Sequence, residues 1–111
     1  MLGCDFRCAY CQNWFTSQSI KDDASTTKSV PVSAGEICEQ AISKNSIVVV
    51  STYNEPLITS EWAKEVFQEA KRKNLLTAYV SNGHGTPEVL EYMSPWIDLM
   101  KIDLKHGKWL K

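Results

Sequence analysis

The sequence lacks any long apolar run, and no stretch approaches the roughly 20 consecutive apolar residues that a membrane-spanning helix needs. It also lacks a basic segment followed by a short apolar one at its start, so we expect no secretion signal. Charge of one sign is not in excess, because the formal net charge is −1. No general attraction to nucleic acid or to an anionic membrane surface follows from such a balance. We therefore expect a cytoplasmic protein whose partners include neither nucleic acid nor a membrane.

Histidine and cysteine are scarce, with two histidines (His84 and His106) and four cysteines in 111 residues. A reducing cytoplasm keeps cysteines as thiols or metal ligands rather than disulfides. Three of them gather near the start of the chain, whereas Cys38 is remote and lies on the apolar face of an expected helix. A buried free cysteine behaves as a small apolar side chain, so we expect Cys38 to pack in the core. The two histidines are expected to be exposed.

Regular elements are expected after residue 32, because the polar segment 17–32 is typical of a mobile loop. Ser33 and Glu36 form a capping box that opens a first helix. A second helix is expected from about Thr59, and a third between Thr86-Pro87 and Pro95. Apolar runs predict strands at 47–50, 75–80 and 97–104.

This alternation of helices and strands predicts an α/β fold with a parallel sheet and right-handed crossovers. A closed (β/α)₈ barrel takes about 250 residues, so the chain is expected to form about half of one, with helices outside the strands. A strand should precede the cysteines, yet only Met1 and Leu2 stand before Gly3. We therefore expect residues 1–111 to be one partial domain, with a cysteine loop at 3–16 and βα units over 33–105.

The three clustered cysteines, Cys4, Cys8 and Cys11, have the spacing C-x3-C-x2-C. A structural zinc site needs four ligands, usually supplied as pairs. Three thiolates can instead hold three irons of a [4Fe–4S] cluster and leave the fourth iron open to another ligand. Two alternatives remain, namely a zinc site completed by His84 and a set of reduced thiols without a metal.

Four segments, spread over most of the chain, carry a resemblance to a known family. They are Gly3–Trp14 around the cysteines, Thr52–Pro56, Val80–His84 and Ile102–Lys105. These segments resemble the radical S-adenosylmethionine (SAM) enzymes, especially the pyruvate formate-lyase activating enzymes and the radical SAM member of the AmmeMemoRadiSam system. Many members of that family have Gly-Gly where this sequence has Tyr53-Asn54.

The resemblance implies a role for several side chains. Cys4, Cys8 and Cys11 would hold a [4Fe–4S] cluster whose fourth iron binds SAM. Glu55 would pair with the SAM ammonium and Lys105 with its carboxylate. The other candidate SAM-binding residues are Tyr10 at the adenine, Ser81, Asn82, and Asp103 beside Lys105 or a cation.

Position in the chain supports the same set independently of the resemblance. Five of these residues follow or close predicted strands, and in α/β folds the binding sites lie at the carboxyl ends of parallel strands. The five are Glu55, Ser81, Asn82, Asp103 and Lys105. Each also has a structural alternative. Glu55 would cap the helix that follows, Ser81 and Asn82 would form a turn, and Asp103 and Lys105 would be a weak surface pair.

The resemblance implies an enzyme that takes one electron, from a carrier such as flavodoxin or ferredoxin, and cleaves SAM to a 5′-deoxyadenosyl radical. That radical would abstract hydrogen from a substrate, which in activating enzymes is a glycine of a partner protein. The alternative functions are a metal-binding module without catalysis, holding zinc or an Fe–S cluster, and an inactive truncated product. Trp14 and Trp62 are expected to be packing residues.

Overall fold

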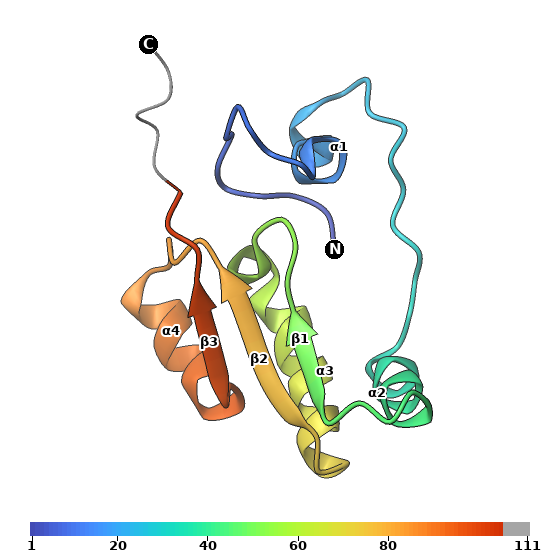
Figure 1. Ribbon diagram of the computed structural model, residues 1–111. Coiled ribbons are helices and arrows are strands. Elements are labelled where there is room, and N and C mark those ends of the chain that lie inside the picture. Colours follow the sequence, from blue (N-terminus) through green and yellow to red (C-terminus); the bar gives the residue numbers. More distant parts are fainter. Residues whose placement is uncertain (106–111) are drawn as a thin grey trace.

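The computed structural model describes residues 1–105, and its centre is a three-stranded parallel sheet. The strands β1 (Val48–Ser51), β2 (Leu76–Ser81) and β3 (Leu99–Ile102) lie side by side in chain order (Figure 1). Each strand starts one or two residues later than the sequence predicted. The α/β fold with a parallel sheet, as in part of a (β/α) barrel, is confirmed. His106 lies outside the described residues.

Three helices connect and flank these strands, namely α2 (Ala34–Ser43), α3 (Ser60–Arg72) and α4 (Pro87–Met93). The capping box before α2 is present in both directions, because Ser33 accepts from the Glu36 amide and Glu36 accepts from the Ser33 amide. Pro95 was expected to end the third helix, but α4 ends two residues earlier and Pro95 lies in a 3-10 turn, η3 (Ser94–Trp96).

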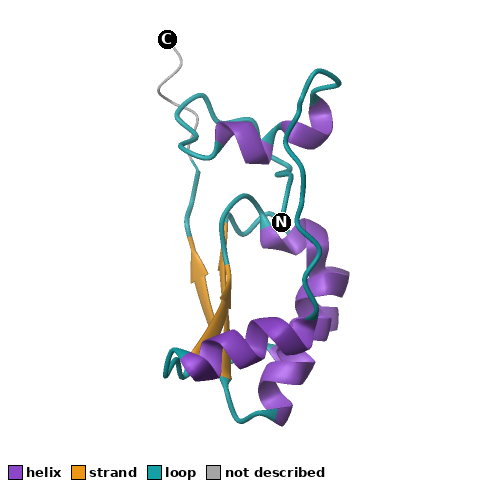
Figure 2. Ribbon diagram, turned by 90° about the vertical axis from the view of Figure 1, so that its right-hand side faces the viewer, coloured by secondary structure: helices purple, strands orange, loops and turns teal. Residues whose placement is uncertain are grey.

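The helices pack against one face of the sheet and form the core there (Figure 2). The rings of Phe67 on α3 and Tyr79 on β2 are fully buried, with centroids 5.4 Å apart. Cys38 is also fully buried, as predicted, and burial raises the pKa of its thiol. Trp62 packs against this core as expected, whereas Trp14 is exposed and carries the Arg7 guanidinium over its ring.

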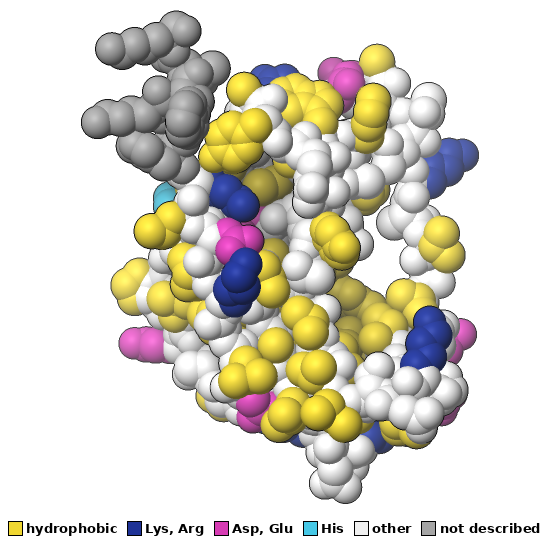
Figure 3. Space-filling model, viewed as in Figure 1, with side chains coloured by type: hydrophobic (Ala, Val, Ile, Leu, Met, Phe, Trp, Pro, Cys, Tyr) yellow, Lys and Arg dark blue, Asp and Glu magenta, His cyan; other side chains and the backbone are white. Residues whose placement is uncertain are grey.

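The opposite face of the sheet is open within the described residues. Side chains alternate between the two faces of a strand, so the burial of Thr77 and Tyr79 directs Leu76 and Ala78 to the other side. The parallel register places Val50 and Leu99 on the same side as Ala78. The small side chain of Ala78 is buried, but Leu76, Val50 and Leu99 are exposed, and Figure 3 shows apolar side chains gathered over the strands.

The cysteine loop lies beyond the carboxyl ends of the strands (Figure 1). It leads into two short helical segments, α1 (Trp14–Ser17) and the 3-10 turn η1 (Ser19–Lys21). The prediction of a loop over 17–32 was therefore wrong at its start, where Ser17 and Gln18 are buried. Residues 22–32 form neither helix nor strand. Within the described part of the chain, no helix is long and apolar enough to cross a membrane.

Candidate functional site

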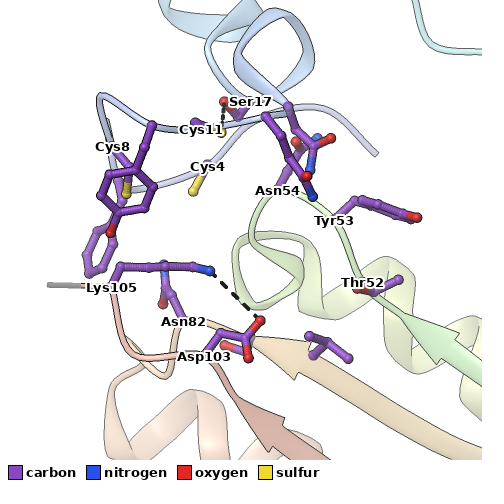
Figure 4. A pocket seen from close by; sticks show the side chains of 16 residues that line it. Cys4, Cys8, Cys11, Ser17, Thr52, Tyr53, Asn54, Asn82, Asp103 and Lys105 are labelled. Atoms are coloured by element: carbon purple, nitrogen blue, oxygen red, sulfur yellow. Dashed lines mark hydrogen bonds and ion pairs between the residues drawn. The ribbon is translucent and has the colours of Figure 1, made fainter.

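A cavity of about 390 Å³ lies between the cysteine loop and the carboxyl ends of the strands (Figure 4). Residues from both ends of the described chain meet there, because the loop covers the ends of all three strands. All but one of the predicted site residues line this cavity, and the exception is Glu55. Those that line it are Cys4, Cys8, Tyr10, Cys11, Ser81, Asn82, Asp103 and Lys105.

The start of the cysteine loop depends on Gly3. This residue has φ +96°, a conformation that side-chain-bearing residues rarely adopt, and a Cβ there would lie 2.5 Å from Cδ1 of Ile20. The Gly3 amide donates to the Thr16 carbonyl at 2.9 Å, and the Gly3 carbonyl accepts from the Glu55 amide at 3.4 Å. Backbone hydrogen bonds therefore tie the loop to α1 and to the segment after β1.

The three loop cysteines are free thiols, and all are partly accessible to the cavity. Partial burial raises the pKa of Cys4, and the nearby carboxylates of Asp5 and Glu55 act in the same direction. The thiol of Cys11 lies 3.5 Å from the hydroxyl of Ser17. Within residues 1–105, no three His, Cys, Asp or Glu side chains are positioned to hold one metal ion together.

Glu55 lies beneath the cavity and is only 2% exposed. Its Oε1 accepts from the Leu57 amide at 2.9 Å, which caps the 3-10 turn η2 (Pro56–Thr59), and from the Ser81 hydroxyl at 2.8 Å. Its Oε2 accepts from the Asn82 amide at 2.7 Å. The carboxylate therefore fills the capping role that the sequence left open, and it also fastens the end of β1 to the end of β2.

Tyr53 and Asn54, which follow β1, have a backbone conformation that favours glycine. Both have positive φ, 64° and 57°, in the left-handed region that glycine adopts without penalty. The side chain of Asn54 offsets the cost of this conformation with two hydrogen bonds. It accepts from the Thr16 hydroxyl at 3.1 Å and donates to the Met1 carbonyl at 3.0 Å. The side chain of Tyr53 is largely exposed.

Asp5 attaches the cysteine loop to the segment after β2, and sequence reasoning missed this residue. Its Oδ1 accepts from the side-chain amide of Asn82 at 2.8 Å, and its Oδ2 lies 2.7 Å from Nδ1 of His84. Partial burial acts to raise the pKa of Asp5, but the hydrogen bonds from His84 and Asn82 outweigh it and lower that pKa. His84 is exposed, as expected, although it is not without a partner. The one sequence feature that could have identified Asp5 as a site residue is its position directly after Cys4, a candidate metal ligand.

Asp103 and Lys105 lie across the cavity from the cysteines (Figure 4). The Lys105 ammonium is 3.8 Å from the Asp103 carboxylate, so the two residues form the ion pair that we expected here from the sequence. Lys101 is closer to the same carboxylate, at 2.5 Å, and its hydrogen bond lowers the pKa of Asp103. Lys105 is therefore the more loosely held of the two cations at this edge.

The comparison with known families agrees with this arrangement. The sequence model of the radical SAM superfamily matches residues 1–109, so the chain belongs to the radical SAM superfamily. Membership of this superfamily implies a [4Fe–4S] cluster and SAM as cofactors.

One relative is similar over nearly the whole chain. It is the uncharacterized protein MJ0808 of Methanocaldococcus jannaschii, which is 33% identical over 103 residues, or 93% of this chain. The chain spans 29% of the length of that protein.

Proposed function

We propose that this chain is the cluster- and SAM-binding part of a radical SAM enzyme. The observation that carries the proposal is the single cavity onto which Cys4, Cys8 and Cys11 open, with polar side chains from the ends of all three strands on its other side. Three thiols with no fourth cysteine at the cavity are a donor set suited to a cluster that keeps one iron open. The fourth cysteine, Cys38, is fully buried in the core.

When bound, the cluster and SAM supply reductive cleavage of SAM and a radical that abstracts hydrogen from a substrate. The chain's own residues hold and orient these groups. Cys4, Cys8 and Cys11 are the proposed iron ligands. Lys105 is the proposed partner of the SAM carboxylate, because it is a cation at the cavity whose ion pair is 3.8 Å long.

Residues near the ends of β1 and β2, together with Tyr10 of the cysteine loop, have the remaining roles. We propose that Glu55 pairs with the SAM ammonium. A carboxylate offers about four acceptor positions, and three of those on Glu55 are occupied by protein donors. The fourth position, on Oε2, is the one that we propose for the ammonium, although the carboxylate is 2% exposed and does not itself line the cavity. Ser81 and Asn82 fix the carboxylate, and Tyr10 is the proposed contact of the adenine.

The finer assignment follows the sequence resemblance to activating enzymes and to the AmmeMemoRadiSam member. On that basis we propose a one-electron carrier such as flavodoxin or ferredoxin as the reductant, and hydrogen abstraction from a protein glycine as the reaction class. The chain spans less than a third of its uncharacterized relative, so these proposals concern the whole protein.

The test is anaerobic reconstitution followed by iron and sulfide analysis. We expect about four irons and four sulfides per chain. Cys4→Ala, Cys8→Ala or Cys11→Ala should each abolish this loading, whereas the control Cys38→Ala should load normally. Addition of SAM and dithionite should then yield 5′-deoxyadenosine, measured by chromatography.

Two outcomes would contradict the proposal. Full loading of the Cys8→Ala protein would remove the ligand assignment. One zinc per chain, without acid-labile sulfide, would instead favour a metal-binding module that has no catalysis.

A further inference from the structure

Ser17, which the sequence predicted to lie in a loop, makes the shorter of the two side-chain contacts to proposed cluster ligands in the described residues. It is the last residue of α1, it lines the cavity, and it is 1% exposed. Its hydroxyl oxygen lies 3.5 Å from the sulfur of Cys11 and 3.3 Å from the Trp14 carbonyl. A buried hydroxyl in this place has few partners, and one of them is the sulfur.

Gln18 determines which way the Ser17 hydroxyl points. Its Nε2 donates to the Phe6 carbonyl at 3.0 Å and to the Ser17 hydroxyl at 3.2 Å. The opposite amide orientation would bring Oε1 against the Phe6 carbonyl, and two acceptors would face each other. The Ser17 oxygen is therefore an acceptor toward Gln18, and its hydrogen is left for the Trp14 carbonyl or for Cys11.

Metal ligation of Cys11 would decide between these two acceptors. A thiol can donate its own hydrogen, but a metal-bound thiolate can only accept. Hydrogen bonds to an ionised acceptor are about twice as strong as those between neutral groups, so the thiolate competes well with the Trp14 carbonyl. Each link of a chain that runs from Gln18 through Ser17 to Cys11 polarises the next.

We propose that Ser17, held by Gln18, donates a hydrogen bond to the Cys11 thiolate and thereby raises the reduction potential of the cluster. Adding an electron makes the cluster and its sulfurs more negative, and a hydrogen-bond donor stabilises that state more than the oxidised one. Ser17 is a positioning residue in this role, since it acts through Cys11. The inference rests on the proposed cluster, and it adds the control of the cluster's potential.

The surroundings of Cys4 differ from those of Cys11. The Cys4 sulfur is 3.7 Å from Oδ1 of Asp5, and the Glu55 carboxylate also acts on this thiol, whereas a backbone hydrogen bond from Phe6 acts in the opposite direction. The two carboxylates at Cys4 oppose reduction, whereas the Ser17 hydroxyl at Cys11 favours it.

The experiment is a redox titration of the reconstituted protein, followed by electron paramagnetic resonance. Ser17→Ala removes one oxygen atom and should make reduction less favourable by roughly tenfold in the equilibrium constant, about 59 mV for one electron. Ser17→Thr keeps the hydroxyl and should restore most of the potential. Gln18→Met removes the donor to Ser17 and should give a smaller shift of the same sign.

The matched control is Ser19→Ala. Ser19 is a neighbouring serine whose hydroxyl donates to the Thr16 carbonyl at 3.0 Å. Its substitution should leave the potential unchanged, with iron content equal to that of the parent. An unchanged potential in a loaded Ser17→Ala protein would overturn the inference, and so would an equal shift in Ser19→Ala. If Ser17→Ala failed to load, an unchanged potential in Gln18→Met would overturn it as well. If the parent itself held no cluster, the proposed function would fail first.

Discussion

The carboxylate of Asp5 lies 2.7 Å from Nδ1 of His84, although the two residues are 79 positions apart in the chain. Asn82 donates to the other oxygen of the same carboxylate. This contact joins the residue after a proposed iron ligand to the segment that follows β2. The cysteine loop is thereby held at one side by Asp5 and at the other by Asn54.

The first prediction concerns this fastening. Asp5→Ala removes both hydrogen bonds of the carboxylate, and for a partly exposed group we expect a loss of about 1 kcal/mol. The reconstituted variant should release iron to a chelator roughly five times faster than the parent. Release is followed by the absorbance of the chelate. Asp23→Ala, in the exposed segment beyond η1, is the control and should release iron at the parent rate. Equal rates for all three proteins would show that the contact does not hold the loop.

A second prediction separates the structural and ligand roles of Glu55. Glu55→Gln keeps the size of the side chain but removes its charge, so affinity for SAM should fall by about 2–5 kcal/mol, the cost of losing one partner of a buried ion pair. Glu65→Gln is the matched control, because Glu65 is an exposed carboxylate of α3 that does not line the cavity, and its affinity for SAM should equal that of the parent. SAM titration of the loaded proteins measures the affinity. A Glu55→Gln protein that is less stable but binds SAM like the parent would return Glu55 to capping alone.

The third prediction follows from the left-handed backbone at Tyr53. A residue with a Cβ costs roughly 1–2 kcal/mol in this conformation, whereas glycine does not. Part of that gain is offset because glycine is more flexible in the unfolded chain. The side chain is largely exposed, so little packing is lost. Tyr53→Gly should therefore raise the free energy of unfolding by about 0.5 kcal/mol in denaturant titrations. Tyr53→Val should lower it, since branching at Cβ makes positive φ less favourable.

A fourth prediction concerns the pH dependence of stability at the start of β3. The Lys71 ammonium, together with the Thr77 amide and hydroxyl, lowers the pKa of Asp98 below its ordinary value of 3.8. Stabilisation by a carboxylate with a lowered pKa is present above the ordinary pKa and is lost as the pH falls through the folded-state pKa. Asp98→Asn should therefore lower the Tm at neutral pH, and the difference from the parent should shrink below about pH 4. A difference that stayed constant into acid would contradict this assignment.

Much of the fold follows from local sequence. The capping residues before α2 and α4 and the apolar runs of the strands predicted the elements in the right order, because these signals act over a few residues. The prediction for the segment from Ser17 was wrong because its structure depends on contacts outside the segment. Its serine and glutamine are polar, and only contacts with Phe6 and Cys11 explain why they are buried.

The candidate site, too, could be predicted from the sequence only in part. Spacing alone drew attention to the three cysteines, and strand ends drew attention to Ser81, Asn82 and Asp103. The geometry of Glu55 could not be read from the sequence, because its position beneath the cavity depends on the register between β1 and β2. The partners of Asp5 were hidden for the same reason, since they are 77 and 79 positions away.

These separations also set an order of events during synthesis. The proposed iron ligands leave the ribosome before the groups that fasten their loop, which are Asn54 after β1 and then Asn82 and His84 after β2. Contacts between residues so far apart in the chain form slowly, so we expect them to form after the strands have paired. The nascent chain therefore carries three unshielded thiols until β2 is complete, a period in which they are open to oxidation. Cluster delivery is best timed after the sheet has formed.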